Sequence, residues 1–120
     1  EKRLVDAVHQ AGAYVKLHIC GNITHLLPGI AQLGVDILDV DHMVAMQTVR
    51  DAVGDRVVLA GNMDPVAVVR NGTPEGIRRA TQRTYEQVGN PYMVNAGCEI
   101  PAGTPVENLK ALCEPVPCRD

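Results

Sequence analysis

The sequence has very few aromatic residues: its 120 residues include three Tyr and neither Phe nor Trp. The core must therefore be aliphatic, built from Val, Leu, Ile and Ala. No apolar run approaches the roughly 18 residues of a membrane-spanning helix and no signal-peptide pattern is present, so no membrane partner and a cytoplasmic location are expected. The net charge of -3 leaves no basic patch, which argues against nucleic acid as a partner.

Cysteine is too sparse for a disulfide framework, because four Cys in 120 residues fall short of the density of a small secreted scaffold. In a reducing compartment, cysteines with a chemical role are more often metal ligands or nucleophiles. Cys20 and Cys98 fit that description, since each follows an apolar run. Cys113 continues the apolar line of a helix and is expected to be buried. Cys118 lies in a proline-flanked tail and is expected to be exposed and chemically idle.

Hydropathy patterns alternate between helix and strand along the chain. Amphipathic spacing predicts a helix over residues 2–11, closed by Gly12. Pro28 inside the second helical pattern predicts a kink or a late start. Residues 104–107 match the S/T-x-x-E capping box and predict a last helix from Thr104. The expected strands cover residues 14–19, 35–40, 57–61 and 92–95, and a helix is expected after each of them.

This alternation predicts an α/β fold with parallel strands and outer helices. Four strands cannot close a β/α barrel, which needs eight. An open half-barrel would leave two strand edges unpaired and its inner face uncovered. The chain also begins with Glu1 inside a helical pattern. We therefore expect residues 1–120 to be a single partial domain, completed by the rest of a longer chain or by a second copy.

Soft donor atoms gather where two of the expected strands end. His18 and Cys20 are two residues apart and share one face of the first strand. Cys98 follows the fourth strand, so it should reach the same rim, where barrel enzymes place their active sites. One imidazole and two thiolates would be three ligands for zinc, with a fourth position left open as in catalytic sites. The alternative is that these residues belong to the core or to a polar network.

Three segments resemble the uroporphyrinogen decarboxylase superfamily, and within it the zinc-dependent methylcobamide:thiol methyltransferases. They are Leu17-His18-Ile19-Cys20-Gly21-Asn22, Ala-Gly-Asn-Met-Asp-Pro at residues 60–65, and Ala-Gly-Cys-Glu-Ile-Pro-Ala-Gly-Thr-Pro-Val-Glu-Asn-Leu at residues 96–109. The resemblance covers essentially the whole chain. It implies a (β/α)8 TIM barrel of which this chain is the C-terminal half, about four βα units. It also implies that His18, Cys20 and Cys98 match the family's zinc ligands.

The resemblance further implies an acidic fourth ligand, which by position matches Asp41. Its neighbour Asp39 points the same way, so the choice between the two stays open, and both can instead be rim carboxylates. Asn62 and Asp64 resemble the family's Gly-Asn-x-Asp-Pro motif and are candidates for substrate contact. For Asp64 the simpler interpretation is a helix cap ahead of Pro65. His42, beside Asp41, is expected to be exposed in a loop.

The ligand set favours alkyl transfer to sulfur over hydrolysis. Zinc deprotonates a bound thiol, and two cysteine thiolates cancel the charge of Zn²⁺, so a third thiolate stays nucleophilic. The hypothesis is that a small-molecule thiol on zinc takes a methyl group from a cobamide (corrinoid), either free or carried by a partner protein. This chain alone is not expected to be active.

Two alternatives stay open. The first is a metal-free uroporphyrinogen decarboxylase-type lyase acting on a tetrapyrrole. That family carries Asn-Leu-Gly-His-Gly where this chain has Asn95-Ala96-Gly97-Cys98-Glu99, which argues against it. The second is a non-catalytic half-barrel fragment.

Overall fold

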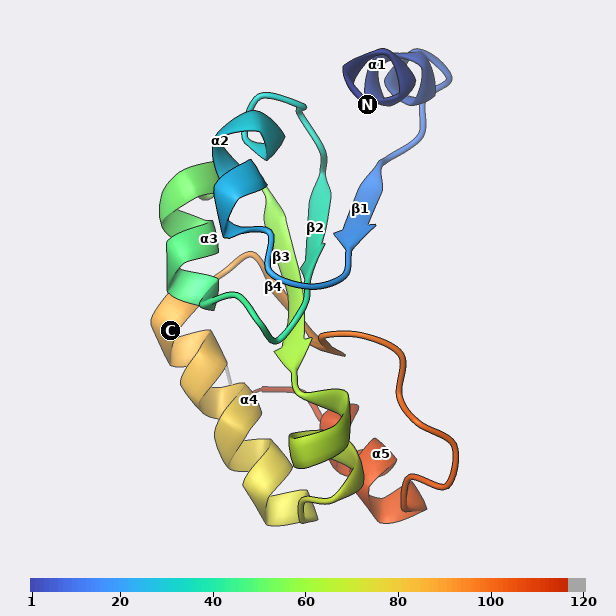
Figure 1. Cartoon of the computed structure of the whole chain (residues 1–120), viewed down its shortest axis with the longest axis vertical. Helices are drawn as coiled ribbons and strands as arrows, with labels where there is room; N and C mark the ends of the chain where they lie inside the picture. Colours follow the sequence, from blue (N-terminus) through green and yellow to red (C-terminus); the bar gives the residue numbers. More distant parts are fainter. Residues whose placement is uncertain (117–120) are drawn as a thin grey trace.

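The computed structural model describes residues 1–116 and contains one parallel sheet of four strands. Strands that follow one another in the sequence also lie side by side, in the order β1-β2-β3-β4 (Figure 1). The strands are β1 (Lys16–Ile19), β2 (Ile37–Val40), β3 (Val58–Met63) and β4 (Tyr92–Ala96). The expected α/β fold class, a half-barrel of parallel strands with helices between them, is confirmed.

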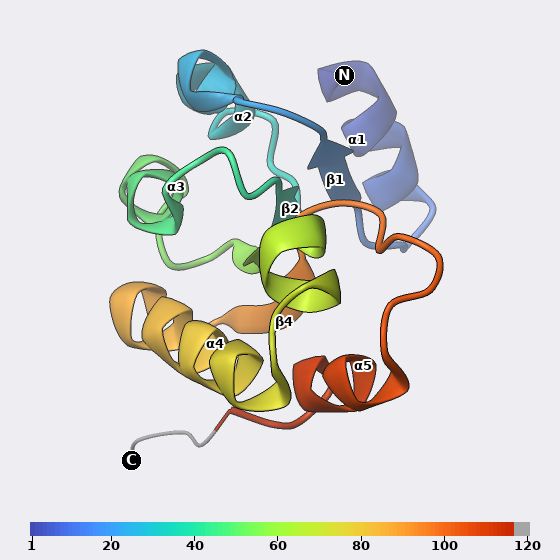
Figure 2. The same cartoon turned by 60° about the horizontal axis from the view of Figure 1, so that its bottom comes forward.

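Helices connect the strands and cover one face of the sheet. Figure 2 shows α2, α3 and α4 in succession along one side, with α5 near the end of β4. The helices are α1 (Lys2–Gln10), the 3-10 turn η1 (Thr24–Leu26), α2 (Leu27–Ile30), α3 (Met46–Val53), the π-helical segment η2 (Pro65–Arg70), α4 (Pro74–Val88) and α5 (Val106–Leu112). Within residues 1–116, no helix combines the length and the apolar character needed to span a membrane.

Two aliphatic clusters form the core between the sheet and its helices. The larger one contains the outward-facing residues of the first three strands and the facing residues of α2 and α3; Leu38, Val40 and Leu59 in it are fully buried. The smaller one joins the ends of β3 and β4 to η2, α4 and α5. Each fully buried side chain contributes about 1.5–3 kcal/mol relative to an exposed one. The core is aliphatic, as the composition predicted.

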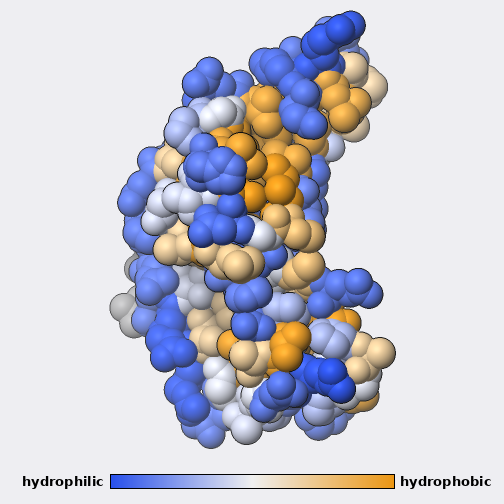
Figure 3. Space-filling view, in the orientation of Figure 1, coloured by the Kyte–Doolittle hydropathy of each residue, from blue (hydrophilic) through white to orange (hydrophobic). Residues whose placement is uncertain are grey.

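The opposite face of the sheet, the inner face of the half-barrel, is open and carries both polar and apolar side chains. Along β1, the half-buried Leu17 and Ile19 pack against the core, while Lys16 and His18 are exposed. A hollow of about 220 Å³ lies on this face, lined by Lys16, Ile37, Ala60, Met93, Val94 and Asn95. Apolar surface gathers beside β1 and α1 (Figure 3), where Leu4 and Tyr14 are 65% and 84% exposed.

Arg50 of α3 ties the ends of several elements together. Its guanidinium donates to the carbonyl oxygens of Gly54 (2.8 Å), Val57 (2.9 Å), Val88 (3.1 Å) and Pro91 (2.8 Å). These carbonyls lie at the end of α3, before β3, at the end of α4 and before β4. Burial lowers the pKa of Arg50 from its ordinary value. The side chain therefore holds the amino-terminal ends of β3 and β4 to the carboxyl-terminal ends of α3 and α4.

Two sequence predictions about helix ends hold. The second helical segment starts late, with Pro28 near the beginning of α2. Asp64 caps η2, because its Oδ1 accepts from the N–H groups of Val66 and Ala67, each at 2.8 Å. Thr73 caps α4 in the same manner, through the Gly76 N–H.

Two other predictions about the C-terminal region are wrong. The Thr104 hydroxyl does not cap α5 but donates to the Pro101 carbonyl at 2.7 Å, and the helix begins at Val106 after Pro105. The Glu107 carboxylate pairs with Lys110 and does not make the capping-box hydrogen bond to the backbone N–H of Thr104. Cys113 is exposed rather than buried, because α5 ends at Leu112, one residue before it. Cys118 lies outside the described residues.

Candidate metal centre

Three soft donor atoms meet at the carboxyl ends of the two edge strands. His18 lies in β1, Cys20 follows β1 directly, and Cys98 comes two residues after β4. The His18 Nε2 lies 3.2 Å from the Cys20 Sγ, which lies 3.6 Å from the Cys98 Sγ. All three donor atoms lie within 4.8 Å of one another. Among residues 1–116, no other group of three or more His, Cys, Asp or Glu meets this criterion.

Close backbone packing positions the two halves of this cluster. The Gly97 N–H donates to the Met63 carbonyl at 2.7 Å, which continues the β3–β4 pairing to the residue before Cys98. A Cβ on Gly97 would lie 2.5 Å from the backbone nitrogen of His42, so only glycine fits here without a backbone shift. The loop after β2 therefore packs directly against the segment that carries Cys98.

The two thiols interact with each other. The hydrogen bond between Cys20 and Cys98 raises the pKa of Cys20, and burial and the nearby Asp41 carboxylate act in the same direction. The two sulfur atoms are thus held close together, 3.6 Å apart. A cation between them would reverse this effect on the pKa of Cys20, since it favours thiolates.

Asp39 stands behind His18. Its Oδ2 lies 3.5 Å from the His18 Nδ1 and 2.8 Å from the Lys16 Nζ, while its Oδ1 accepts from the Asn95 Nδ2 at 3.1 Å. The residue is only 6% exposed. Asp39 thus contacts the ring nitrogen that faces away from Cys20.

Asp41 lies close to the cluster but is not one of the three grouped donors. Its Oδ2 accepts from the Gly21 N–H at 2.8 Å, and its Oδ1 contacts the Met43 N–H (3.2 Å) and the His42 Nδ1 (2.8 Å). Burial works to raise the pKa of Asp41, but the hydrogen bonds from Gly21 and Met43 outweigh it and the pKa is lowered. The carboxylate therefore stays ionised beside the loop that follows Cys20.

The candidate substrate residues Asn62 and Asp64 make contacts within the protein. The Asn62 amide donates to the carbonyls of Val44 (2.7 Å) and Asp41 (3.3 Å). Asp64, the cap of η2, also approaches the His42 Nε2 at 3.5 Å. His42 is in a loop and exposed, as predicted, but its position between two carboxylates was missed. The only sequence feature that indicated this position was the adjacency of Asp41 and His42.

The donor set fits a tetrahedral Zn²⁺. With Zn–S bonds near 2.3 Å and Zn–N bonds near 2.0–2.1 Å, tetrahedral geometry separates ligand atoms by about 3.5–3.8 Å. The observed separations of 3.6 Å for the two sulfur atoms and 3.2 Å for nitrogen and sulfur need only a small opening of the His18–Cys20 pair. One imidazole and two thiols are also ligands that zinc prefers.

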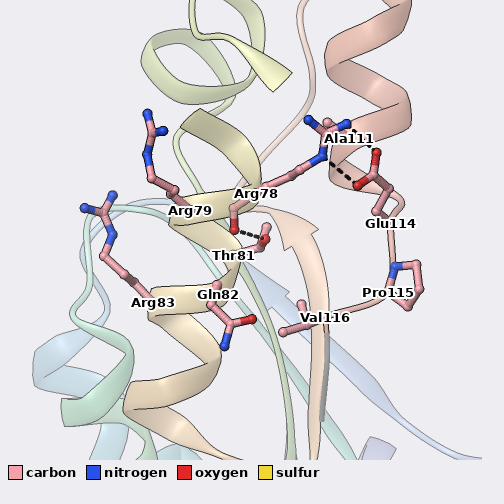
Figure 4. Close-up of a pocket in the computed structure, with 9 residues that line it drawn as sticks. All are labelled: Arg78, Arg79, Thr81, Gln82, Arg83, Ala111, Glu114, Pro115 and Val116. Carbon is pink, nitrogen blue, oxygen red and sulfur yellow. Dashed lines mark hydrogen bonds and ion pairs between the residues drawn. The ribbon is translucent and has the colours of Figure 1, made fainter. Parts of the chain in front are cut away.

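A second hollow, of about 460 Å³, lies between α4 and the segment 111–116, and none of the three cluster residues lines it. Its lining includes Arg78, which binds Glu114 through two hydrogen bonds of 2.7 Å (Figure 4). Arg79 and Arg83 extend from the other side of the helix in this view. Because Arg78 is neutralised by Glu114, we do not assign chemistry to this hollow.

The family model described as uroporphyrinogen decarboxylase (URO-D) matches residues 1–117. The chain belongs to the uroporphyrinogen decarboxylase family. The family predicted from the three sequence segments is therefore confirmed.

Relatives within the URO-D family include methyltransferases and decarboxylases. The chain is 36% identical to "Methylcobamide:CoM methyltransferase MtbA" of Methanosarcina acetivorans over 115 residues, 95% of this chain and 33% of the relative. It is 39% identical to "Uroporphyrinogen decarboxylase" of Coxiella burnetii over 93 residues, 75% of this chain and 25% of the relative. A solved "methyltransferase from Methanosarcina mazei" superposes with a TM-score of 0.78 at 28% identity, over 92% of this chain and 32% of that one. The chain thus spans between a quarter and a third of the length of these relatives.

Proposed function

We propose that the chain is part of a zinc-dependent methyltransferase that moves a methyl group from a methyl-cobamide to a thiol. The carrying observation is the convergence of His18, Cys20 and Cys98 from two edge strands. The similarity to relatives described as methylcobamide:CoM methyltransferases supports the same reaction class. In this proposal residues 1–120 form one partial domain, the C-terminal half of a barrel.

The three donors would hold Zn²⁺ and leave a fourth position open for substrate. Zinc in this position would supply one thing, a lowered pKa for a substrate thiol, which is then held as its thiolate. During transfer the new sulfur–carbon bond forms while the cobalt–carbon bond breaks. Both electrons of the broken bond stay with cobalt, and the proton of the thiol goes to solvent.

Other residues of the rim would support this site. We propose Asp41 as the exchangeable fourth ligand, since its carboxylate is ionised and hydrogen-bonded to the loop after Cys20. Asn62 and Asp64 fix the loop after β2 and the start of η2, and in this proposal they border the substrate. The cobamide, free or carried by a partner protein, would approach the same rim.

The open inner face would be completed by further βα units of a longer chain or by a second copy. Both edges of the sheet lie beside the cluster, so additional strands would form the rest of its pocket. The alternative of a decarboxylase is favoured by the decarboxylase relatives. That reaction needs no metal, however, and leaves the three converging donors without a role.

The test is zinc content by elemental analysis of the purified chain and of the variants His18→Ala and Cys98→Ser. We expect about one zinc per chain, lost in both variants. Cys113→Ser is the matched control, because this thiol is exposed and lies outside the cluster; it should retain zinc. A wild-type chain that binds no zinc under conditions where it is folded would overturn the proposal.

A further inference from the structure

Asp39 of β2 is held in one position by contacts from two other strands, β1 and β4. It is the register partner of His18 on β2, so its carboxylate lies beside the imidazole. Lys16, on the same face of β1 as His18, contacts the Oδ2 at 2.8 Å. Asn95 of β4 reaches across β3 to the Oδ1, at 3.1 Å. This reach is possible because the register partner of Asp39 on β3 is Ala60, whose side chain is only a methyl group.

The contacts distinguish Asp39 from a metal ligand. Its side chain is 8% exposed, whereas that of His18 is 33% exposed. It faces the Nδ1 of His18 at 3.5 Å, whereas the Nε2 of the same ring faces the Cys20 sulfur at 3.2 Å. The imidazole therefore separates the carboxylate from the cluster.

We propose that Asp39 is a positioning residue that fixes the ring of His18 and directs the Nε2 lone pair toward the metal. This inference rests on the proposed zinc site. In a neutral ring, the carboxylate 3.5 Å from the Nδ1 favours the tautomer with its proton on Nδ1, and this leaves the Nε2 lone pair free to bind a metal. A carboxylate behind a histidine ligand also raises its basicity, and removal of such a partner typically weakens metal binding 10–100-fold. The Asn95 amide, which donates to the Oδ1, holds the carboxylate in place.

The first experiment measures zinc affinity by competition with a chromophoric chelator. Asp39→Asn should bind zinc about 10–100-fold more weakly than the wild type. Asp36→Asn is the matched control, because Asp36 also contacts a histidine, His9 at 2.8 Å, but at the opposite end of the strands. Lys16→Met is a second control, because it removes the ion pair between Lys16 and Asp39 but keeps the contact between Asp39 and His18. Both controls should stay within about threefold of the wild type.

The outcomes separate this inference from the proposed function. Wild-type affinity in Asp39→Asn would overturn the positioning role, while loss of zinc in His18→Ala and Cys98→Ser would still support the zinc site. Equal weakening in Lys16→Met and Asp39→Asn would show a general effect of the ion pair and also overturn it. Failure of the wild type to bind zinc would overturn both.

A second measurement needs no variant, which guards against misfolding of Asp39→Asn. Long-range ¹⁵N–¹H correlation spectra of the zinc-loaded wild type report which ring nitrogen carries the proton. The expected state of His18 is a protonated Nδ1 and a metal-bound Nε2. A metal-bound Nδ1 would overturn the inference.

Discussion

At the scale of single residues, Gly97 determines how closely the cluster can assemble. A Cβ there would lie 2.5 Å from the backbone nitrogen of His42 and 3.1 Å from the carbonyl carbon of Asp41. Gly97→Ala must therefore shift backbone, and we expect a loss of about 1–3 kcal/mol in the free energy of unfolding together with weaker zinc binding. Urea denaturation and chelator competition measure the two effects.

The matched control for this prediction is Gly29→Ala. Gly29 lies inside α2 and has open space around its Cβ position. Alanine should therefore be neutral or should stabilise the chain by up to about 1 kcal/mol. Equal behaviour of the two variants would contradict the role assigned to Gly97.

The residues of the cluster were predictable because their chemistry and their strand positions are both local in the sequence. The i, i+2 spacing of His18 and Cys20 on a short strand fixed their common face. The different surroundings of Asp39 and Asp41, on which our proposal of Asp41 as the fourth ligand rests, were not predictable, because both residues follow the same spacing. They depend on contacts with Lys16 and Asn95, and Asn95 is 56 residues away from Asp39.

At the scale of elements, the four hydrogen bonds of Arg50 join the carboxyl-terminal ends of α3 and α4 to the amino-terminal ends of β3 and β4. Arg50→Met would leave four carbonyl groups without this donor, and bonds to charged groups are worth about 1.5–3 kcal/mol each. We expect a loss of at least about 2 kcal/mol in unfolding free energy, measured by urea denaturation. Arg56→Met, at an exposed position, should change it by less than about 0.5 kcal/mol.

The packing of α1 depends on pH through Asp36, whose carboxylate accepts from the Val15 N–H and contacts His9. The Val15 bond, followed by the His9 contact, lowers the pKa of Asp36 from its ordinary value of 3.8. Its stabilising contribution is therefore present above pH 3.8 and is lost as the pH falls through the lower, folded-state pKa.

Urea midpoints at about pH 5 and about pH 3 test this pH dependence. Asp36→Asn should be less stable than the wild type at the higher pH, and the difference should shrink at the lower pH. Asp51→Asn, which removes an exposed bond to Gln47 within α3, should show no such convergence. A constant difference between the wild type and Asp36→Asn would contradict the prediction.

The order and type of the elements were predictable from periodicity, but some of their ends were not. β1 starts at Lys16 rather than at residue 14, because the N–H of Val15 bonds to the Asp36 side chain instead of extending the strand. The capping motif at Thr104 failed because α5 begins one residue later than the motif requires, with Pro105 at the N-cap position, and the Thr104 hydroxyl instead donates to the Pro101 carbonyl. Side-chain bonds between such neighbours compete with regular caps and are not visible in a motif.

At the scale of the whole molecule, zinc would join the first strand to the last. Cys20 and Cys98 are 78 residues apart, so zinc bound at the proposed site would stabilise the entire sheet against unfolding. At free zinc about 100-fold above the Kd, the stabilisation is about 2.7 kcal/mol, which raises the Tm by roughly 10 °C for a chain of this size. Thermal melts with zinc and with a chelator measure the shift, and Cys98→Ser should show none.

The half-barrel was predictable from the count of strand–helix repeats, since four parallel strands fall short of a closed barrel. What covers the inner face was not predictable, because no residue of this chain identifies the occupant. Met93 is 53% exposed there, and the Lys16 side chain is 50% exposed. These positions would become buried when further strands pair with β1 and β4.

The split origin of the cluster has an evolutionary consequence. The first βα unit supplies an imidazole and a thiol, and the last unit supplies one thiol. Neither unit alone carries three donors, so the site is not inherited with any single repeat. In the proposed zinc site, one replacement at Cys98 would remove the only donor that the last unit supplies. A single codon after β4 would therefore separate a metal-binding form of this barrel from a metal-free one.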